Sequence, residues 1–279
     1  MSKIALVTGT SSGIGMHTAV LLAQSGYTVV ATMRNLAKAA PLKQEANAHA
    51  VSLDIRHLDV QDGASITACV QDVMRTYGHI DLLVNNAGSG FLGTIEETTL
   101  EDLHQVMDVN FFGVWRVTQA VFPVMRAANS GRIVTVSSVG GLIGQPFNDA
   151  YCAAKFAVEG LMESLAPVAK RVGIHVCLIE PGPVHTEFVA SVREKAARSQ
   201  TAAEVYAPMR KAYLAGAMQA FATIGQQGAD VGRVIVEAAT AEIPHFRYPT
   251  SATMSELIAR KYVDPTGDAI IELTGARLP

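Results

Sequence analysis

A tyrosine and a lysine four residues apart, in the segment Tyr151-Cys-Ala-Ala-Lys155, are the residue pair best suited to chemistry. Positions i and i+4 of a helix share one face, so the phenol and the ammonium would project to the same side. A cation beside a phenol stabilises the phenolate and lowers the tyrosine pKa from its usual ~10. The pair predicts acid–base catalysis by Tyr151 with help from Lys155, although the same spacing is common in surface pairs.

Two further polar residues fall where they could assist this pair. Ser138 follows a β-branched run that ends at Val136, and a hydroxyl there could bond a substrate oxygen and stabilise charge on it. Asn110 falls early in a helical stretch, where a buried amide could hold a water linking Lys155 to solvent. Each residue alone has an ordinary structural explanation. Together they predict a catalytic set of Asn110, Ser138, Tyr151 and Lys155.

A glycine-rich segment, Thr8-Gly-Thr-Ser-Ser-Gly-Ile-Gly15, predicts a site for the phosphates of a nucleotide. Its first glycine allows a sharp turn, the second lets backbone amides approach a pyrophosphate, and the third lets the following helix pack closely on the strand. That helix would offer free N–H groups and a positive dipole end to the phosphates. The alternative is a tight structural turn. The predicted contacts are Gly9, Thr10, Ser11, Ser12, Gly13, Ile14 and Gly15.

The end of the second β-branched run indicates which nucleotide binds. An NAD enzyme places an acidic side chain there to bind the ribose hydroxyls. Here the run ends in Ala31-Thr-Met-Arg34-Asn35, and the next acid is Glu45. Arg34 would instead form charge-assisted bonds to a 2′-phosphate, with a hydroxyl donor from Ser11. The sequence therefore favours NADP(H) over NAD(H), with an ordinary exposed arginine as the alternative.

Short β-branched runs alternate with helical stretches through the first two thirds of the chain. The runs are Ile4–Thr8, Thr28–Thr32, Ile55–Val60, Ile80–Val84, Arg132–Val136 and His175–Ile179. Apolar residues recur every three or four positions in the helical stretches Gly13–Gln24 and Asp62–Tyr77, and Tyr151 opens another through about Arg171. Strands separated by such helices pair through crossovers. We therefore expect a Rossmann-like, doubly wound parallel α/β sheet, with its ligand crevice beyond the carboxyl ends of the strands.

The pattern changes after about residue 190. Residues 191–242 are expected to form two or more helices rich in Ala, Met and Tyr, followed by a short strand at 246–248 and a helix over 251–262. These helices could be a packed layer, but we favour a lid over an apolar substrate. We predict one domain over 1–279, with the cofactor-binding and catalytic core in 1–190 and the lid helices and last strand in 191–279.

The composition argues against several classes of protein. The 279 residues are 49% hydrophobic and 17% charged with a net charge of −3, which allows one large core and leaves no basic stripe for nucleic acid. No apolar run reaches the ~18 residues of a spanning helix. The three cysteines are too scattered for a disulfide framework or a zinc site, and no acids or cysteines at metal-binding spacing accompany His175 and His185. We expect no metal, no membrane span and a cytoplasmic location.

The motifs resemble those of the short-chain dehydrogenase/reductase family, in order and spacing, over residues 3–190. Tyr151 lies thirteen positions after Ser138, which matches the family's spacing and selects Ser138 over Ser137. The stretch 138–161 and the segment Phe246-Arg-Tyr-Pro-Thr250 are similar to a subgroup of hydroxysteroid and retinol dehydrogenases. The matching motifs are Thr8–Gly15, Asp59-Val60, Asn85-Asn-Ala-Gly88, Asn110, Ser138, Tyr151 with Lys155, and Pro181-Gly-Pro-Val-His-Thr186.

The resemblance implies a role for each matched residue. Tyr151 would be the acid–base, with Lys155 as its partner and ribose anchor. Ser138 would hold the substrate oxygen, and Asn110 would be a relay residue. Further cofactor contacts would come from Asp59 and Val60 at the adenine, from Asn86, Ala87 and Gly88 along the adenosine, and from Pro181, Gly182, Val184 and Thr186 at the nicotinamide.

The predicted function is NADP(H)-dependent reduction of a carbonyl, or the reverse oxidation of a secondary alcohol, on an apolar small molecule such as a steroid or retinoid. The alternative is a catalytically silent NADP(H) sensor or scaffold of the same fold. The family resemblance also implies a homodimer or homotetramer. The apolar face of Phe156, Val158, Leu161, Met162 and Leu165 could be core, but we favour a seam between subunits. Glu180 could face the cofactor crevice or solvent.

Overall fold

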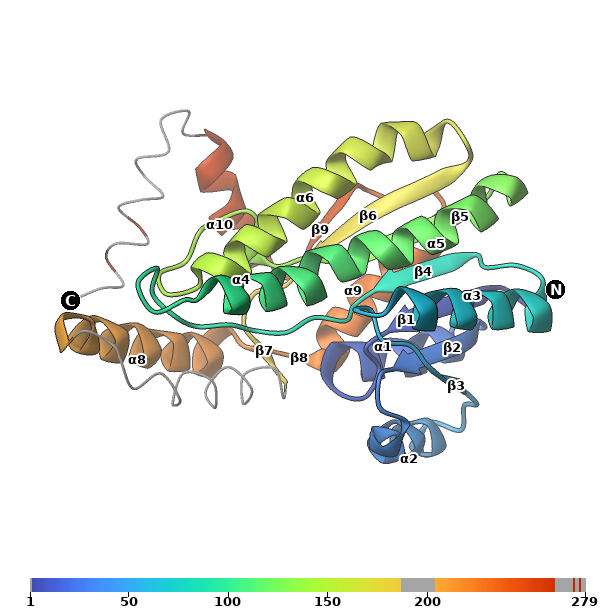
Figure 1. The fold of residues 1–279 in the computed structure, drawn as a ribbon, viewed down its shortest axis with the longest axis horizontal. Coiled ribbons are helices and arrows are strands. Elements are labelled where there is room, and N and C mark those ends of the chain that lie inside the picture. Colours follow the sequence, from blue (N-terminus) through green and yellow to red (C-terminus); the bar gives the residue numbers. More distant parts are fainter. Residues whose placement is uncertain (1, 187–203, 264–272, 274–275, 277–279) are drawn as a thin grey trace.

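A central sheet of seven strands, all paired in parallel, organises the computed structural model (Figure 1). The strands are β1 (Ile4–Thr8), β2 (Thr28–Met33), β3 (Asp54–His57), β4 (Leu82–Asn85), β5 (Gly131–Val136), β6 (Ile174–Glu180) and β9 (Arg247–Pro249). Their order, β3-β2-β1-β4-β5-β6-β9, confirms the predicted doubly wound fold. It reverses direction between β1 and β4, and ligands bind such sheets beyond the carboxyl ends of the strands at that point. The structure describes residues 2–186, 204–263, 273 and 276.

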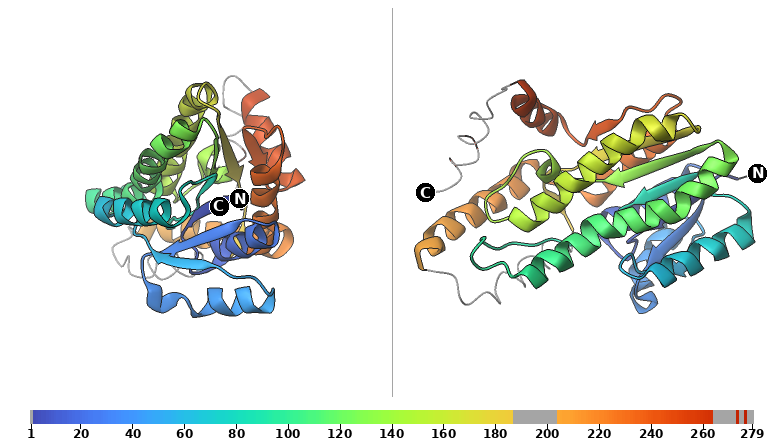
Figure 2. Two further views of the ribbon diagram at one scale, coloured as in Figure 1. Left: turned by 90° about the vertical axis from the view of Figure 1, so that its right-hand side faces the viewer. Right: turned by 45° about the horizontal axis from the view of Figure 1, so that its top comes forward.

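Helices cover both faces of the sheet (Figures 1 and 2). On one face α1 and α9 bury Leu22 and Ile235, and on the other α3, α5 and α6 bury Val73, Val117 and Val158. Burial on both faces explains why the strands are almost continuously apolar. The helices are α1 (Gly13–Gln24), α2 (Ala40–Ala48), α3 (Gly63–Tyr77), α4 (Leu100–Met107), α5 (Gly113–Ala128), α6 (Asp149–Lys170), α8 (Ala207–Ile224), α9 (Gly228–Thr240) and α10 (Ala252–Val263).

The six predicted strands start within two residues of the observed ones, but the third ends earlier than predicted. The sequence suggested a strand to Val60, whereas β3 ends at His57. The Asp59 carboxylate accepts a hydrogen bond from the Gln61 amide (3.0 Å), which turns the chain away from the sheet. Asp62 then caps α3, where its carboxylate accepts a hydrogen bond from the Ala64 amide (2.8 Å).

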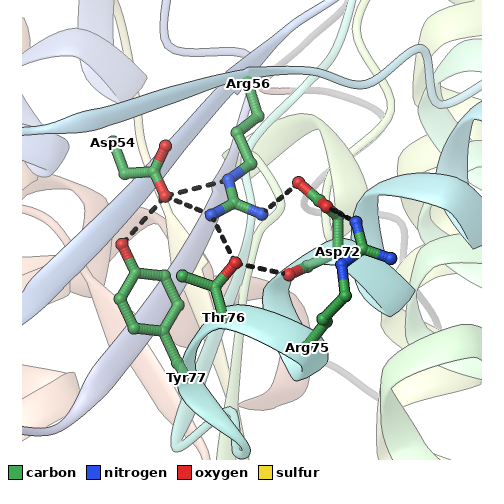
Figure 3. A network of polar contacts seen from close by, with 6 residues as sticks. All are labelled: Asp54, Arg56, Asp72, Arg75, Thr76 and Tyr77. Atoms are coloured by element: carbon green, nitrogen blue, oxygen red, sulfur yellow. Dashed lines mark hydrogen bonds and ion pairs between the residues drawn. The ribbon is translucent and has the colours of Figure 1, made fainter.

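A polar network ties the edge strand β3 to helix α3 (Figure 3). The Arg56 guanidinium donates to Asp54 beside it (2.5 and 2.8 Å) and to Asp72 of α3 (2.6 Å). The Tyr77 hydroxyl at the end of α3 also donates to Asp54 (2.9 Å). Charged side chains along an edge discourage pairing with a strand of another chain. This network therefore has a structural explanation at the far edge of the sheet.

In the C-terminal third of the chain, helix α9 belongs to the core, whereas helix α8 is mostly exposed. Helix α9 packs against α1, and its Val231, Ile235 and Ala238 are fully buried. Strand β9 and helix α10 occupy the predicted places of the last strand and helix. Of the expected lid, α8 is described, whereas 187–203 lies outside the described residues. Within the described ranges, no helix is long and apolar enough to cross a membrane.

Candidate active site

The glycine-rich loop after β1 is closely packed against the segment that follows β4. Gly9 has a φ of +71°, and a Cβ there would lie 2.7 Å from the Ala87 Cα. Gly13 has a φ of +58°, and a Cβ there would lie 3.0 Å from the Thr186 side chain. Glycine is required at both positions by conformation and by contact. The loop, Ala87 and Thr186, all predicted cofactor contacts, are therefore brought together.

The amino-terminal end of α1 is open to an anion. Its N-cap residue, Ser12, makes no side-chain capping bond, and the first turn of the helix contains no acidic residue. The first N–H groups of a helix have no partner within the helix, and the helix dipole places partial positive charge there. Gly13 and Gly15 keep this end free of side-chain bulk. The start of α1 thus offers the donors and partial charge that suit a phosphate, and its role in binding one stays a prediction.

Two predicted cofactor contacts, Asn86 and Thr10, hold the loop in place from within the protein. The Asn86 side-chain amide donates to the carbonyl oxygens of Thr8 (2.9 Å) and Gly9 (3.0 Å). The Thr10 hydroxyl is fully buried and donates to the Thr32 carbonyl of β2 (3.1 Å). The sequence interpretation missed Thr8, whose hydroxyl oxygen accepts from the amides of Asn86 (3.0 Å) and Ala87 (3.1 Å). Its position directly before the first glycine was the available signal.

Helix α6 carries Tyr151 and Lys155 on one face near its amino-terminal end, as predicted. The Lys155 side chain is 5% exposed, and its ammonium donates to the Val136 carbonyl at the end of β5 (3.0 Å). The same ammonium lies 5.9 Å from the centre of the Tyr151 ring. Ser138 follows β5, and its hydroxyl oxygen accepts from the Gly140 amide (3.0 Å). The structure thus places Ser138, Tyr151 and Lys155 around one point at the carboxyl edge of the sheet.

Burial changes the acid–base properties of this pair. It raises the pKa of Tyr151 to about 12, although hydrogen bonding with Ser138 opposes the rise. Burial lowers the pKa of Lys155 to about 8, and the negative charge of Glu159 opposes that change. The sequence suggested that Lys155 would lower the tyrosine pKa. In the structure, desolvation of the phenolate outweighs any such effect, so the direction is opposite.

Asn110 lies in a π-helical turn, Asp108–Phe112, between α4 and α5. Its fully buried amide donates to the Ser89 and Val106 carbonyls (both 2.9 Å), and its oxygen accepts from the Ser89 amide (3.1 Å). A Cβ at Gly88 would lie 2.9 Å from the Asn110 oxygen and 3.9 Å from the Lys155 nitrogen. Because Gly88 has no side chain, both the Asn110 oxygen and the Lys155 ammonium can lie close to its backbone. Single π-helical turns are frequent at functional sites.

The segment after β6 lies beside the turn that follows Ser138. The Pro181 carbonyl accepts from the Val139 amide (2.9 Å), which ties this segment to the turn Val139–Gly141 after Ser138. Val184 lies in the short strand β7 (Val184–His185), which pairs with β8 (Gln226–Gln227). Gly182 packs against Met254 of α10. The four residues predicted at the nicotinamide, Pro181, Gly182, Val184 and Thr186, thus lie on one short segment.

The residues predicted at the adenine end lie at the ends of β2 and β3. Arg34 directly follows β2, is exposed, and has no hydrogen-bond or ion-pair partner among the described residues. Val60 is 8% exposed and packs against the backbone of Gly113. Asp59 is partly exposed, and its backbone amide donates to the Ser65 hydroxyl oxygen (3.0 Å). Within the described part of the chain, no group of His, Cys, Asp or Glu side chains is arranged to hold a metal.

A family model described as short chain dehydrogenase matches residues 3–197. The chain belongs to this family. It is 41% identical over 271 residues to human 17-beta-hydroxysteroid dehydrogenase type 1, covering 95% of this chain and 82% of that protein. It is 39% identical over 276 residues to retinol dehydrogenase 8 of Bos taurus, covering 96% of this chain and 88% of that protein. These similarities confirm the predicted subgroup.

Solved structures of the family share the fold of this short-chain dehydrogenase. An enzyme from Burkholderia phymatum in complex with NAD has a TM-score of 0.79 at 26% identity, covering 94% of each chain. Actinorhodin polyketide ketoreductase with NADPH has a TM-score of 0.77 at 31% identity, covering 91% of this chain and 97% of that chain. The fold therefore binds a nicotinamide cofactor, and both forms of it occur among similar structures.

Proposed function

We propose that the protein is an NADP(H)-dependent oxidoreductase that reduces ketones, and oxidises the matching secondary alcohols, on apolar substrates of the steroid or retinoid type. The observation that carries this proposal is the convergence of Ser138, Tyr151 and Lys155 at the carboxyl edge of the sheet. The names of the two relatives, a hydroxysteroid dehydrogenase and a retinol dehydrogenase, support the substrate class.

In this proposal Tyr151 donates a proton to the carbonyl oxygen during reduction. A pKa of about 12 keeps its phenol protonated at neutral pH, which is the state that a proton donor requires. The Ser138 hydroxyl bonds the same oxygen and holds it beside the phenol. The Lys155 ammonium stabilises the phenolate that remains after proton transfer. The bound dinucleotide supplies the hydride in reduction and accepts it in oxidation.

The cofactor is proposed to lie across the carboxyl ends of the strands. The open start of α1 and the glycine loop would bind the pyrophosphate. Asp59 and Val60 would lie at the adenine, Asn86 to Gly88 along the adenosine, and the segment 181–186 at the nicotinamide. Asn110 would order a water beside Lys155, since its oxygen lies close to the position of Gly88.

A preference for NADP(H) rests on Arg34. Its exposed guanidinium is free of partners among the described residues and can therefore form charge-assisted bonds to a 2′-phosphate. We expect Arg34→Asp to raise the KM for NADPH by about 10- to 100-fold and to shift preference toward NADH, since such bonds contribute ~1.5–3 kcal/mol. Arg126→Asp, an equal charge change at the exposed end of α5, should leave the preference unchanged. Wild-type turnover with NADH equal to that with NADPH would contradict the proposal.

A catalytically silent NADP(H) sensor of the same fold is less well supported. The Lys155 ammonium is almost fully buried, and burial of a charged group is unfavourable. A protein that only binds the dinucleotide could use Lys155 as a ribose anchor but has no need of the phenol of Tyr151 and the hydroxyl of Ser138 beside it. The chemistry proposed here does need both.

The decisive experiment follows NADPH consumption with a panel of steroid ketones, retinal, and aliphatic and aromatic ketones. We expect turnover of at least one apolar ketone, and a loss of ~10²- to 10⁴-fold in Tyr151→Phe with unchanged NADPH affinity. Tyr77→Phe, in the β3 edge network, is the matched control and should retain activity. Turnover that survives in Tyr151→Phe would show that the proton comes from another group.

A further inference from the structure

A buried cluster of charged residues lies directly behind the candidate active site. Arg247, the first residue of β9, lies between α6 and the end of β6. Its guanidinium contacts Glu159 (3.1 Å) and Glu163 (2.9 Å) of α6, and its Nε lies 3.0 Å from a carboxylate oxygen of Glu180 at the end of β6. One arginine thus connects the catalytic helix to the strand that leads into Pro181.

Burial makes this cluster energetically unfavourable. Glu159 is 5% exposed and Glu180 is fully buried, and one oxygen of Glu159 and both of Glu180 lack a hydrogen-bond donor within the described residues. Burial, and next the charge of Glu159, raise the pKa of Glu180 to about 8. Burial also raises the pKa of Glu159, but Ser137, Arg247 and Lys155 oppose that rise. The pKa of about 8 favours the protonated form of Glu180 at neutral pH, whereas the cations Arg247 and Lys155 favour the charged form of Glu159.

Glu159 lies one helical turn after Lys155, on the same face of α6. The turn that follows Ser138 covers this stretch: a Cβ at Gly141 would lie 3.0 Å from the Lys155 carbonyl and 3.1 Å from the Glu159 Cγ. The carboxylate is therefore enclosed next to the catalytic lysine, where its effect is weakly screened by water. A carboxylate in this place favours the protonated form of the lysine.

We propose that Glu159, held in place by Arg247, is a positioning residue that keeps Lys155 protonated for proton transfer at Tyr151. Buried ion pairs are weak contributors to stability, because desolvation offsets their attraction. An arrangement in which two buried carboxylates share one guanidinium is therefore better explained by its effect on the neighbouring lysine. The inference rests on the proposed carbonyl reductase function.

The sign of the effect follows from the groups that face Glu159. These are Lys155 and Glu163 from α6, Glu180 from β6 and Arg247 from β9. Glu159→Gln removes the negative charge with little change in shape, so the lysine should lose its proton at lower pH. Above that pH the tyrosine lacks its cation, and reduction should slow. For unit charges a helical turn apart, we expect a shift of ~0.5–1.5 pH units.

The test compares pH profiles of ketone reduction for the wild type, Glu159→Gln and Glu163→Gln. Glu163 is the matched control, because it contacts the same guanidinium from the same helix but its side chain is 65% exposed. A second measurement follows the Lys155 resonance of ¹³C-lysine-labelled protein without cofactor, assigned by its absence in Lys155→Met. We expect Glu159→Gln to lower both midpoints, Glu163→Gln to leave them in place, and Glu159→Asp to restore most of the shift.

The outcomes separate this inference from the proposed function. Equal midpoints in the wild type and Glu159→Gln, by activity and by NMR, would overturn the role of Glu159 while reductase activity stood. Equal shifts in Glu159→Gln and Glu163→Gln would also overturn it, since a general loss of charge would then suffice. A wild type that reduces no ketone would remove the proposed function, and the NMR midpoint would still report whether Glu159 acts on Lys155.

Discussion

The ammonium of Lys155 is required by the proposed reaction, but its burial lowers the stability of the folded protein. Its pKa falls from 10.5 to about 8 because burial disfavours the ammonium, and Glu159 opposes the fall. Between these values the unfolded chain binds more protons at this residue than the folded chain. The contribution of Lys155 to the free energy of unfolding therefore increases as the pH rises through this window.

The comparison with Lys155→Met isolates this contribution from those of other groups. We expect the unfolding free energy of the wild type, relative to the variant, to rise by ~1–3 kcal/mol between pH 8 and pH 10.5. Urea denaturation at several pH values measures it. The exposed Lys170 at the end of α6 provides the control, and Lys170→Met should show no such rise. A constant difference for Lys155→Met would show that its ammonium is solvated.

Helix α8 is the element whose attachment should affect substrate binding. Arg210 pairs with the side chain of Glu97 (2.5 Å), in the segment after β4. The Tyr213 ring lies 5.5 Å from the ring of Phe147, and the Asn148 side chain donates to the Tyr213 hydroxyl (2.7 Å). Phe147 and Asn148 directly precede α6. Helix α8 thus joins two segments that flank the site, which fits a wall or lid over an apolar substrate.

Breaking the Arg210 ion pair should loosen α8 without unfolding the sheet. Glu97 is 6% exposed in its side chain, so Arg210→Met removes a cation from a buried carboxylate. We expect local opening of α8 to become easier by ~1–3 kcal/mol, with faster amide exchange there and a KM for substrate raised more than kcat is lowered. Lys211→Met, exposed on the same helix, is the control. Unchanged exchange in α8 would show that the apolar contacts alone hold the helix.

At the scale of the whole molecule, three exposed aromatic side chains in the π-helical turn, α5 and α6 predict self-association. Phe112, Trp115 and Phe156 are 45%, 46% and 39% exposed. The predicted seam on α6 is corrected in part, because Val158 and Met162 are fully buried in the core. Exposed apolar patches often mark contacts between proteins. A homodimer or homotetramer stays a prediction, as does a cytoplasmic location.

Light scattering should give at least twice the chain mass of 29.6 kDa for the wild type. Trp115→Lys should lower the mass toward that of one chain, because a charge would be buried in the contact. Ile243→Lys, on an exposed residue outside these elements, should not. Trp115 is the single tryptophan of the chain, so dilution of the wild type should also shift its fluorescence. A wild type of single-chain mass at micromolar concentration would refute self-association.

Local patterns were enough for most of the fold and for the grouping of Ser138, Tyr151 and Lys155, whose catalytic roles stay a prediction. Strand starts followed from apolar runs, and the shared face of Tyr151 and Lys155 followed from helix geometry. The end of β3 was missed because a side-chain turn at Asp59 overrides a favourable apolar sequence. Helix α9 was expected with the lid, but it lies in the core against α1. Its apolar face alone could not show which surface covers it.

The sequence by itself determined the order of the elements, the glycine loop and the spacing of the candidate catalytic residues, since these depend on geometry within a few residues. The tertiary structure decided how charges meet and how deeply they are buried. Glu180, expected in the crevice or in solvent, lies inside the protein beside Arg247, 67 positions along the chain. The pKa of Tyr151 rises instead of falling for the same reason. Desolvation depends on everything that surrounds a group, and that is known only once the whole chain has folded.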